Sequence, residues 1–304
     1  MTQAAYKHFA TTDSQPSAQA LFDKAASLHD DFGGSYCILP ENQGQKPASE
    51  QNTGEILEQG FLPKSGEFYV MQFLDLSHLD EMLALQDRVY ADLPDSEKNF
   101  IIPKTREFFE KHLTSGHPII GVVCGDQIVA QSIIRTPSVT DPKTGMTDMP
   151  HLSDLPVDTL TIMQGVLCDP AHRGNKLMQG MVKQWLSWAG ANGRSNAVAE
   201  IEVRNHHSWS VFIDEGLWLV SIGHDKSDGS NLYNAHQALP EDGRIKYKAI
   251  KKIGEEFTNV AKGESFTTCP TQDLQQQKAL MDLGYACRGW DKSSKTMAFT
   301  KAQP

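Results

Sequence analysis

Residues 158–217 read DTLTIMQGVLCDPAHRGNKLMQGMVKQWLSWAGANGRSNAVAEIEVRNHHSWSVFIDEGL, and this stretch alternates strand, helix, strand and helix. The apolar run Leu160 to Cys168 has the length of a buried strand, and Asp169-Pro170 ends it because proline lacks the N–H that a ladder needs. Between positions 177 and 186, apolar residues recur at the spacing of one helix face packed on a sheet. The sequence therefore predicts a strand, a short turn and a helix.

The second half of this stretch repeats the alternation. Ala197 to Val203 alternates apolar and acidic side chains, which is typical of a strand. Asn205 is a suitable N-cap for a helix that runs to Glu215, and Gly216 is a suitable stop. We expect a second strand and helix that pack beside the first pair.

The turn between the first strand and its helix is the first candidate for chemistry. A strand that ends in a glycine-containing turn and opens a helix presents free backbone N–H groups at a positive dipole end, which suits phosphates. The alternative is an ordinary strand-to-helix turn, which is common in α/β domains, and the turn alone favours this alternative.

The whole stretch resembles the GCN5-related N-acetyltransferase (GNAT) superfamily. The phosphate loop of that superfamily reads Q/R-x-x-G-x-G/A, and here Arg173 matches its first position while Lys176 and Met178 replace the small residues. Its second motif reads N-x-x-A-x-x-x-Y-x-x-x-G-F. That motif is matched here by Asn205, Ser208, Phe212, Gly216 and Leu217, with Phe212 at the tyrosine position. The resemblance covers roughly residues 66 to 238.

The resemblance implies an α+β fold of three layers, with a mixed, mostly antiparallel central sheet flanked by helices. It implies an acyltransferase domain at 66–239, which leaves an N-terminal helix and polar arm at 1–65 and a C-terminal addition at 240–304. The superfamily transfers acetyl from acetyl-CoA directly to an amine in a ternary complex, without a metal. The coenzyme would contact Val166, Leu167, Cys168, Arg173, Gly174, Asn175, Lys176, Leu177, Met178, Asn205, Ser208 and Phe212.

Candidate acid and base residues lie on the second strand and beyond it. Glu200 and Glu202 share one strand face, so they are candidates to attract a cationic amine and accept its proton, although paired acids on a strand are more often hydrated. Phe212 has no proton to give, so Tyr233 is a candidate to protonate the departing thiolate. The alternative is a coenzyme-A-binding or regulatory module without catalysis, which the residues at positions 176, 178 and 212 favour.

Composition narrows the classes of partner. The 304 residues include 28 basic and 38 acidic side chains, so the net charge of −10 gives no broad basic surface for nucleic acid. The five cysteines are scattered without metal-site spacing. There is no apolar leader and no run of about eighteen apolar residues, so we expect a cytoplasmic protein with no membrane partner. The expected partner is a small-molecule amine, and the expected assembly is a monomer or a homodimer.

The flanking segments predict further elements. Upstream we expect a helix at 18–28, a strand at 67–76, helices at 79–90 and 104–113, and a hairpin at 118–134. A long polar segment at 135–158 is either a lid or a disordered insert, and we favour a flap beside the substrate. Strands are expected at 217–222 and 230–239. Near the end we expect a helix at 270–284 and a hairpin at 285–301. The segment at 274–289 echoes residues 203–221, either as a decayed half repeat or as a common helix-glycine-strand junction, and we favour the junction.

Overall fold

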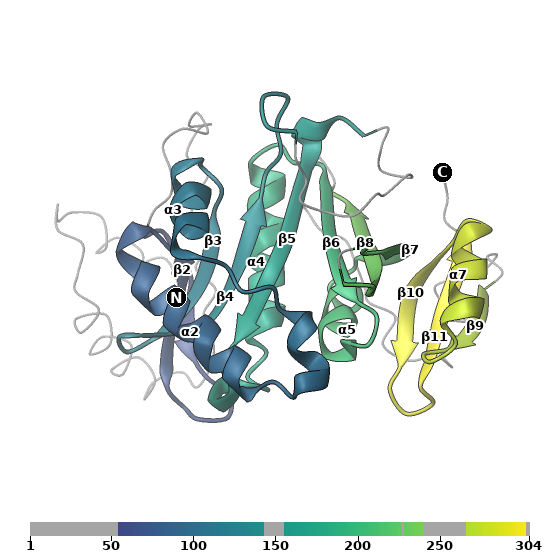
Figure 1. Ribbon diagram of the computed structural model, residues 1–304, viewed down its shortest axis with the longest axis horizontal. Coiled ribbons are helices and arrows are strands. Elements are labelled where there is room, and N and C mark those ends of the chain that lie inside the picture. Colours follow the sequence, from purple (N-terminus) through teal and green to yellow (C-terminus); the bar gives the residue numbers. More distant parts are fainter. Residues whose placement is uncertain (1–53, 143–154, 227, 240–265, 302–304) are drawn as a thin grey trace, which may run out of the picture.

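The structure is a computed structural model that describes residues 54–142, 155–226, 228–239 and 266–301. Its strands form an 11-stranded sheet in the order β1-β2-β3-β4-β5-β6-β8-β7-β10-β11-β9 (Figure 1). The strands are β1 (Ile56–Phe61), β2 (Phe68–Phe73), β3 (Ile119–Cys124), β4 (Gln127–Arg135), β5 (Leu160–Cys168), β6 (Asn196–Glu202), β7 (Trp218–His224), β8 (Asn231–Ala238), β9 (Phe266–Pro270), β10 (Tyr285–Asp291) and β11 (Thr296–Lys301). The helix expected at 18–28 and the middle of the expected flap lie outside the described residues.

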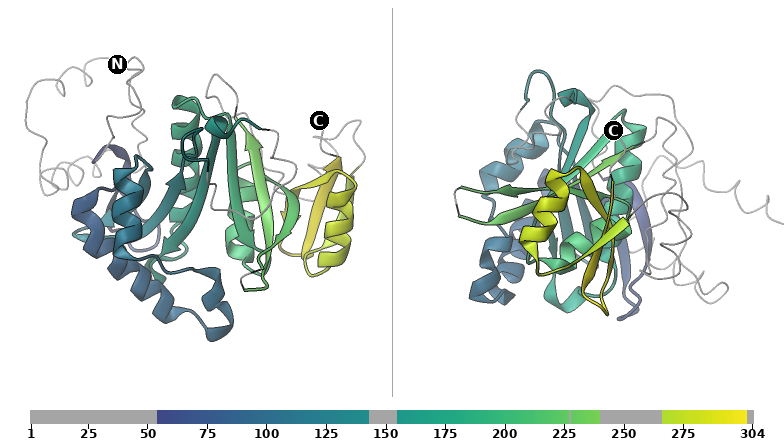
Figure 2. Two further views of the ribbon diagram at one scale, coloured as in Figure 1. Left: turned by 45° about the horizontal axis from the view of Figure 1, so that its top comes forward. Right: turned by 90° about the vertical axis from the view of Figure 1, so that its right-hand side faces the viewer.

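Five α-helices of the described chain flank this sheet: α2 (Leu79–Asp92), α3 (Arg106–Thr114), α4 (Leu177–Ala191), α5 (His206–Asp214) and α7 (Leu274–Asp282). Helices α2 and α3 lie on one face and α4 on the other, as the right-hand view of Figure 2 shows. Every strand pairing is antiparallel except that of β5 with β6, which is parallel. The predicted fold class, a mixed and mostly antiparallel sheet flanked by helices, is confirmed.

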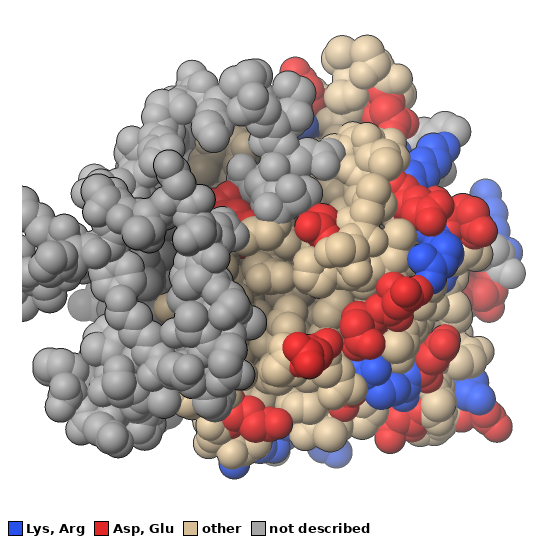
Figure 3. Space-filling model, turned by 90° about the vertical axis from the view of Figure 1, so that its left-hand side faces the viewer, with Lys and Arg blue, Asp and Glu red and all other residues tan. Residues whose placement is uncertain are grey.

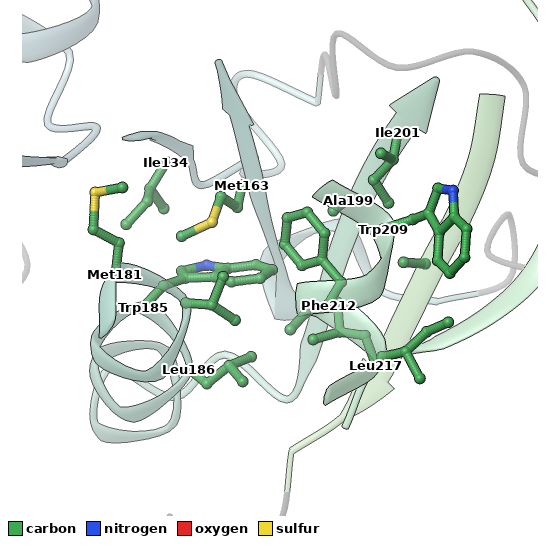
Figure 4. Packing of buried hydrophobic residues seen from close by; sticks show 14 of the residues in the cluster. Ile134, Met163, Met181, Trp185, Leu186, Ala199, Ile201, Trp209, Phe212 and Leu217 are labelled. Atoms are coloured by element: carbon green, nitrogen blue, oxygen red, sulfur yellow. The ribbon is translucent and has the colours of Figure 1, made fainter. Parts of the chain in front are cut away.

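Two apolar cores lie on the two faces of the sheet. The larger core packs α4 and α5 against the central strands, and Figure 4 shows the fully buried Trp185 of α4 and Phe212 of α5 within it. Their rings meet edge to face at 6.5 Å between centroids. The second core packs α2 and α3, including Met82 and Phe109, against β3, β4 and β5. Helices therefore pack against the central strands of the sheet on both faces.

The parallel strands β5 and β6 pair only over their first halves. Backbone register runs from Leu160 opposite Asn196 to Met163 opposite Ala199, and no described strand pairs with that edge of β5 beyond this point. Gly165 follows immediately with φ +57°, where a Cβ would collide with the Ile133 side chain. A residue that needs this conformation inside a strand bends the strand. The carboxyl ends of β5 and β6 thus leave a gap between them.

Helix ends follow the local signals that the sequence predicts. The Asn205 side chain accepts a hydrogen bond from the Ser208 N–H at 3.1 Å, and Gly216 ends the turn after α5 at φ +96°.

Strands β1 and β9 have no counterpart among the predicted elements. Strand β1 pairs along β2, so the segment assigned to a polar arm contributes a strand to the sheet.

The C-terminal unit, residues 266–301, repeats the topology of the first unit, residues 196–238. Both run strand, helix, strand, strand, and in both the last strand lies between the other two. Helices α5 and α7 each have 9 residues, and the interval from N-cap to stop glycine is the same in both units. The hairpin register also shifts at matching places, between Leu219 and Ser221 and between Cys287 and Gly289. This agreement exceeds what a common helix-glycine-strand junction requires.

The two units meet edge to edge at one end of the sheet (Figures 1 and 2). Strands β7 and β10 share one register pair, Leu219 with Cys287. Side chains supply further contacts, since the Tyr233 hydroxyl donates to Gln277 Oε1 at 2.5 Å. The Trp209 and Trp290 rings meet at 5.2 Å between centroids. The C-terminal unit is therefore joined mainly by side chains.

The surface carries both signs of charge. On the face that Figure 3 shows, acidic and basic side chains of the described residues are interspersed, without a continuous basic area. In the described part of the chain, no helix is long and apolar enough to cross a membrane.

Candidate active site

The candidate site begins with the β5–α4 turn, residues 169–176, at the carboxyl end of β5. Asp169 caps a short 3-10 turn at Pro170–His172, and its side chain accepts from the Ala171 N–H at 3.0 Å. Gly174 at φ +80° and Lys176 at φ +61° are both left-handed, and α4 begins at Leu177. Left-handed residues ahead of a helix turn successive N–H groups toward one side, which makes a concave anion site.

The N–H groups at the end of this turn and at the start of α4 have no acceptor within the described residues. From Gly174 through Gln179, no backbone or side-chain oxygen of the described chain receives these N–H groups. The first turn of any helix leaves such donors, and here the turn before the helix adds more. Free donors at a positive dipole end suit an anionic ligand.

Contacts from outside fix the shape of the turn. Asn175 is buried, its amide donates to the His172 carbonyl at 2.9 Å, and its Oδ1 accepts from the Lys64 N–H at 2.8 Å. The Lys64 ammonium donates to the Arg173 carbonyl at 3.2 Å. A Cβ at Gly174 would displace that ammonium, and the left-handed φ of +80° favours glycine there. The turn is thus preformed, with a lysine against it.

Two ion pairs join the turn to α2. Arg88 donates from Nε to Asp169 at 2.7 Å and from Nη2 to the Ile128 carbonyl at 2.8 Å. Arg173 donates to Asp92 at 2.7 Å. Burial raises the pKa of Asp169, but the hydrogen bonds from Arg88, the Ala171 N–H and His172 outweigh burial, so the net pKa lies below 3.8. Asp169 is therefore a carboxylate that anchors the turn.

The residues assigned to the pantetheine arm lie on the open edge of β5. Val166, Leu167 and Cys168 are within the half of β5 that pairs with β4 but not with β6. Burial raises the pKa of the Cys168 thiol to about 11, so this cysteine is a thiol rather than a nucleophilic thiolate at neutral pH. The edge offers backbone groups to an extended ligand.

Helix α5 begins at His206, shortly after the end of β6 at Glu202. The Asn205 side-chain oxygen accepts from the Ser208 backbone N–H in the cap described above, so this oxygen is already engaged. Phe212, further along α5, is 2% exposed and packs against Trp185 in the larger core. Figure 4 shows its ring close to Met163 and Ala199, the last paired residues of β5 and β6. Phe212 thus forms the apolar floor beneath the point where the strands part.

The two acids on β6 differ in their surroundings. Glu202 is buried, and it accepts from the Arg204 Nε at 2.6 Å and from the Arg204 N–H at 2.5 Å. Arg204 neutralises Glu202, so this carboxylate is not an unpaired charge for a cationic amine. Glu200 is half-buried and lies opposite Asn234 in the sheet, nearer the gap.

Tyr233 lies between α5 and the C-terminal unit. It is 1% exposed, and burial raises the pKa of its hydroxyl well above the ordinary value. The hydroxyl proton is donated to Gln277, whose amide in turn donates to the Pro270 and Thr271 carbonyls at 2.8 and 3.0 Å. These contacts give Tyr233 a structural partner, and its assignment as a catalytic acid stays a prediction.

One feature escaped the local sequence patterns. An interunit pocket of about 890 Å³ lies between the end of β6, the β7–β8 hairpin and the C-terminal unit. Its walls include Glu202, Arg204, Trp209, Leu274, Trp290 and Lys292. His206 also lines the pocket. It is exposed, as is His207, and the centroids of their two rings lie 3.9 Å apart.

Within the described ranges, no group of three or more His, Cys, Asp or Glu side chains suits a metal ion.

Comparison with known proteins gives structural matches alone. No protein-family model and no curated protein matches the sequence. The matching solved structures include yncA, an acetyltransferase from Salmonella typhimurium with its cofactor acetyl-CoA, at 13% identity and TM-score 0.42, over 57% of this chain and 95% of that one. They also include the GNAT domain of S. lividans PAT, at 15% identity and TM-score 0.43, over 60% and 97%.

A further match is an N-acetyltransferase from Staphylococcus aureus, at 14% identity and TM-score 0.40, over 56% of this chain and 98% of that one. The S. lividans domain bears the name of the superfamily that the sequence motifs resemble. Identities and scores of this size describe a likeness of fold and carry nothing about substrate or mechanism.

Proposed function

We propose that the protein is an acetyl-CoA-dependent N-acetyltransferase that moves an acetyl group to the amine of a small molecule by direct attack in a ternary complex. The observation that carries this proposal is the β5–α4 turn. It combines two left-handed residues, a row of N–H groups and a lysine ammonium, and it lies at the end of the strand that parts from β6. Acetyl-CoA would supply a diphosphate for this turn and a thioester for the reaction.

The residues of the turn would bind rather than react. The N–H groups of Gly174 to Met178 would hold the diphosphate, while the charges of Lys64 and the exposed Lys176 would favour it. The open edge of β5 at Val166 to Cys168 would hold the extended arm by backbone hydrogen bonds. The acetyl group would then lie in the gap between the strands.

Transfer also requires a neutral amine. A carboxylate accepts the proton of an ammonium most effectively when its pKa has been raised toward neutral pH. Glu200, half-buried on β6 and near the gap, is the proposed acceptor, directly or through water. Glu202 is proposed to position Arg204 instead, because its oxygens already receive two hydrogen bonds from that residue.

A coenzyme-binding module without catalysis is the second candidate. Two observations favour it: Phe212 has no proton to donate, and Tyr233 already donates its hydroxyl proton to Gln277. This module would bind acetyl-CoA at the same turn.

Titration calorimetry with acetyl-CoA tests the turn. Gly174→Ala introduces a Cβ that strains a φ of +80° and collides with Lys64, so we expect affinity to fall roughly tenfold or more, about 1.4 kcal/mol. Gly193→Ala is the matched control, because Gly193 has φ +69° at the other end of α4 with open space around it. It carries the same backbone strain away from the turn. Equal affinity in both variants, or no binding by the wild type, would refute the proposal.

Thiol release separates the two candidates. The wild-type chain is incubated with acetyl-CoA and a panel of amines, and free coenzyme A thiol is measured. Release that depends on the amine supports the transferase. Tight binding of acetyl-CoA without amine-dependent release supports the binding module.

A further inference from the structure

The interunit pocket differs from the coenzyme turn in location and in composition. Its walls come from both units: the end of β6 and the β7–β8 hairpin of the first unit, and the β9–α7 turn and β10–β11 hairpin of the second. We infer that this pocket binds the acceptor, and that the acceptor is an amine with an aromatic or other apolar body and a carboxylate. Its role as an acceptor site depends on the proposed function.

The apolar part of the pocket is rigid. Trp209 is buried, and its indole N–H donates to the Val203 carbonyl at 3.1 Å, which fixes the ring. Trp290 meets it edge to face at an interplanar angle of 78° and is half exposed. Leu274 of α7 completes this wall. Fixed aromatic faces bind a flat or apolar group with little loss of side-chain entropy.

The first unit contributes a neutral pair to the pocket. Arg204 donates to Glu202, to the Asn99 side chain at 3.0 Å and to the Ser96 carbonyl at 3.4 Å. Its guanidinium also lies over the Phe100 ring at 5.3 Å. Arg204 therefore joins the loop after α2 to the end of β6, and its charge is balanced by Glu202.

The remaining charges leave a positive excess on the side of the C-terminal unit. Lys292 and Lys295 are exposed on the β10–β11 hairpin, and neither forms an ion pair with a described residue. Opposite them, Asp228 accepts a hydrogen bond from the Ser230 N–H at 2.8 Å within its own hairpin. Two lysines against one carboxylate, in a protein of net charge −10, mark a local site for an anionic group.

The pocket reaches the carboxyl end of β6. Glu202, the last residue of β6, lines it together with Val203, and β6 is the strand that parts from β5 beyond Ala199. A carboxylate held at Lys292 and Lys295 would leave the amine of the same molecule free to face β6. The acceptor class therefore differs from the purely cationic amine that the two acids of β6 suggest from the sequence.

Tryptophan fluorescence of the full chain tests this inference without turnover. L-phenylalanine and phenethylamine form a matched pair of probes, since they differ by the carboxylate alone. We expect a saturable change with L-phenylalanine, and an affinity at least tenfold tighter than for phenethylamine. The double variant Lys292→Gln with Lys295→Asn should remove this preference, because asparagine tolerates the φ of +50° at position 295. Lys301→Gln, an exposed lysine outside the pocket, should change neither affinity.

Equal affinities for the two probes, no saturable change, or a preference that survives the double variant would overturn the inference. Calorimetry with acetyl-CoA on the same samples separates the two proposals. If acetyl-CoA binds and L-phenylalanine does not, the pocket inference alone fails. If L-phenylalanine binds with the predicted preference and acetyl-CoA does not, the proposed function fails and the carboxylate site remains.

Discussion

Tyr233→Phe removes one hydroxyl from the contact between the two units. The Tyr233 side chain is 1% exposed, and its hydroxyl donates to Gln277 Oε1 at 2.5 Å. Gln277 is 0% exposed, so water cannot replace the lost donor. A buried acceptor left without a partner costs about 1 to 3 kcal/mol, while the phenyl ring keeps its packing. We expect the free energy of unfolding to fall by about this amount.

Urea denaturation measures the effect as a lower midpoint with an unchanged m-value. Tyr285→Phe is the control, because Tyr285 is a half-buried tyrosine of the C-terminal unit whose hydroxyl forms no hydrogen bond with another described residue. Thiol release is measured on the same samples, and the turnover of Tyr233→Phe should stay within about threefold of the wild type, well short of the ~100-fold loss typical of a removed general acid. An unchanged midpoint with a turnover loss of ~100-fold or more would refute the structural reasoning and assign the hydroxyl to catalysis.

Two further predictions concern the cores. Phe212→Tyr should lower the free energy of unfolding by about 1 to 3 kcal/mol, since the new hydroxyl would be buried in the apolar core; a stable and faster enzyme would instead place position 212 in a wet active site. Burial lowers the pKa of His112 from 6.5 to about 3. Between these two pH values, His112 is protonated in the unfolded chain and neutral in the folded chain. Stability should therefore be intact above pH 6.5 and fall by roughly 3 kcal/mol by about pH 4.5, at about 1.4 kcal/mol per pH unit. His112→Gln should flatten this slope in denaturation curves, whereas the exposed His224→Gln should leave it unchanged.

Local sequence patterns predicted most elements of the fold because their signals are local. The apolar run of β5 ends at Pro170, and the cap at Asn205 and the stop at Gly216 need only neighbouring residues. Strand β9 escaped prediction because its burial has no apolar alternation and its partner, β11, comes later in the chain. Pairing, rather than pattern, makes it a strand.

The features of the candidate site that are built from adjacent residues were also predicted, whereas those that bring distant segments together were not. The β5–α4 turn follows from a strand, a glycine and a helix start that are adjacent in sequence. The Lys64 ammonium against that turn comes from a distant segment, and so do Lys292 and Lys295, which line the interunit pocket together with Trp209. No short window of sequence contains these combinations. The pairing of Glu202 with Arg204 was not predicted, because β6 ends at Glu202 and Arg204 turns back onto it from the following turn. The alternation of acids along the strand instead favoured a shared role with Glu200.

The meeting of β7 and β10 determines where another polypeptide could extend the sheet. Without the C-terminal unit, β7 would lose its one register pair with β10 and the side chains packed along it, and an uncovered edge strand is the usual template for β-augmentation and aggregation. The C-terminal unit moves that edge to β9, which has five residues, is largely exposed and ends at Pro270, which cannot donate a ladder bond. Removing residues 266–301 would thus uncover β7 and bare the buried ring of Tyr233, which makes the second unit a guard against self-association as well as a wall of the pocket.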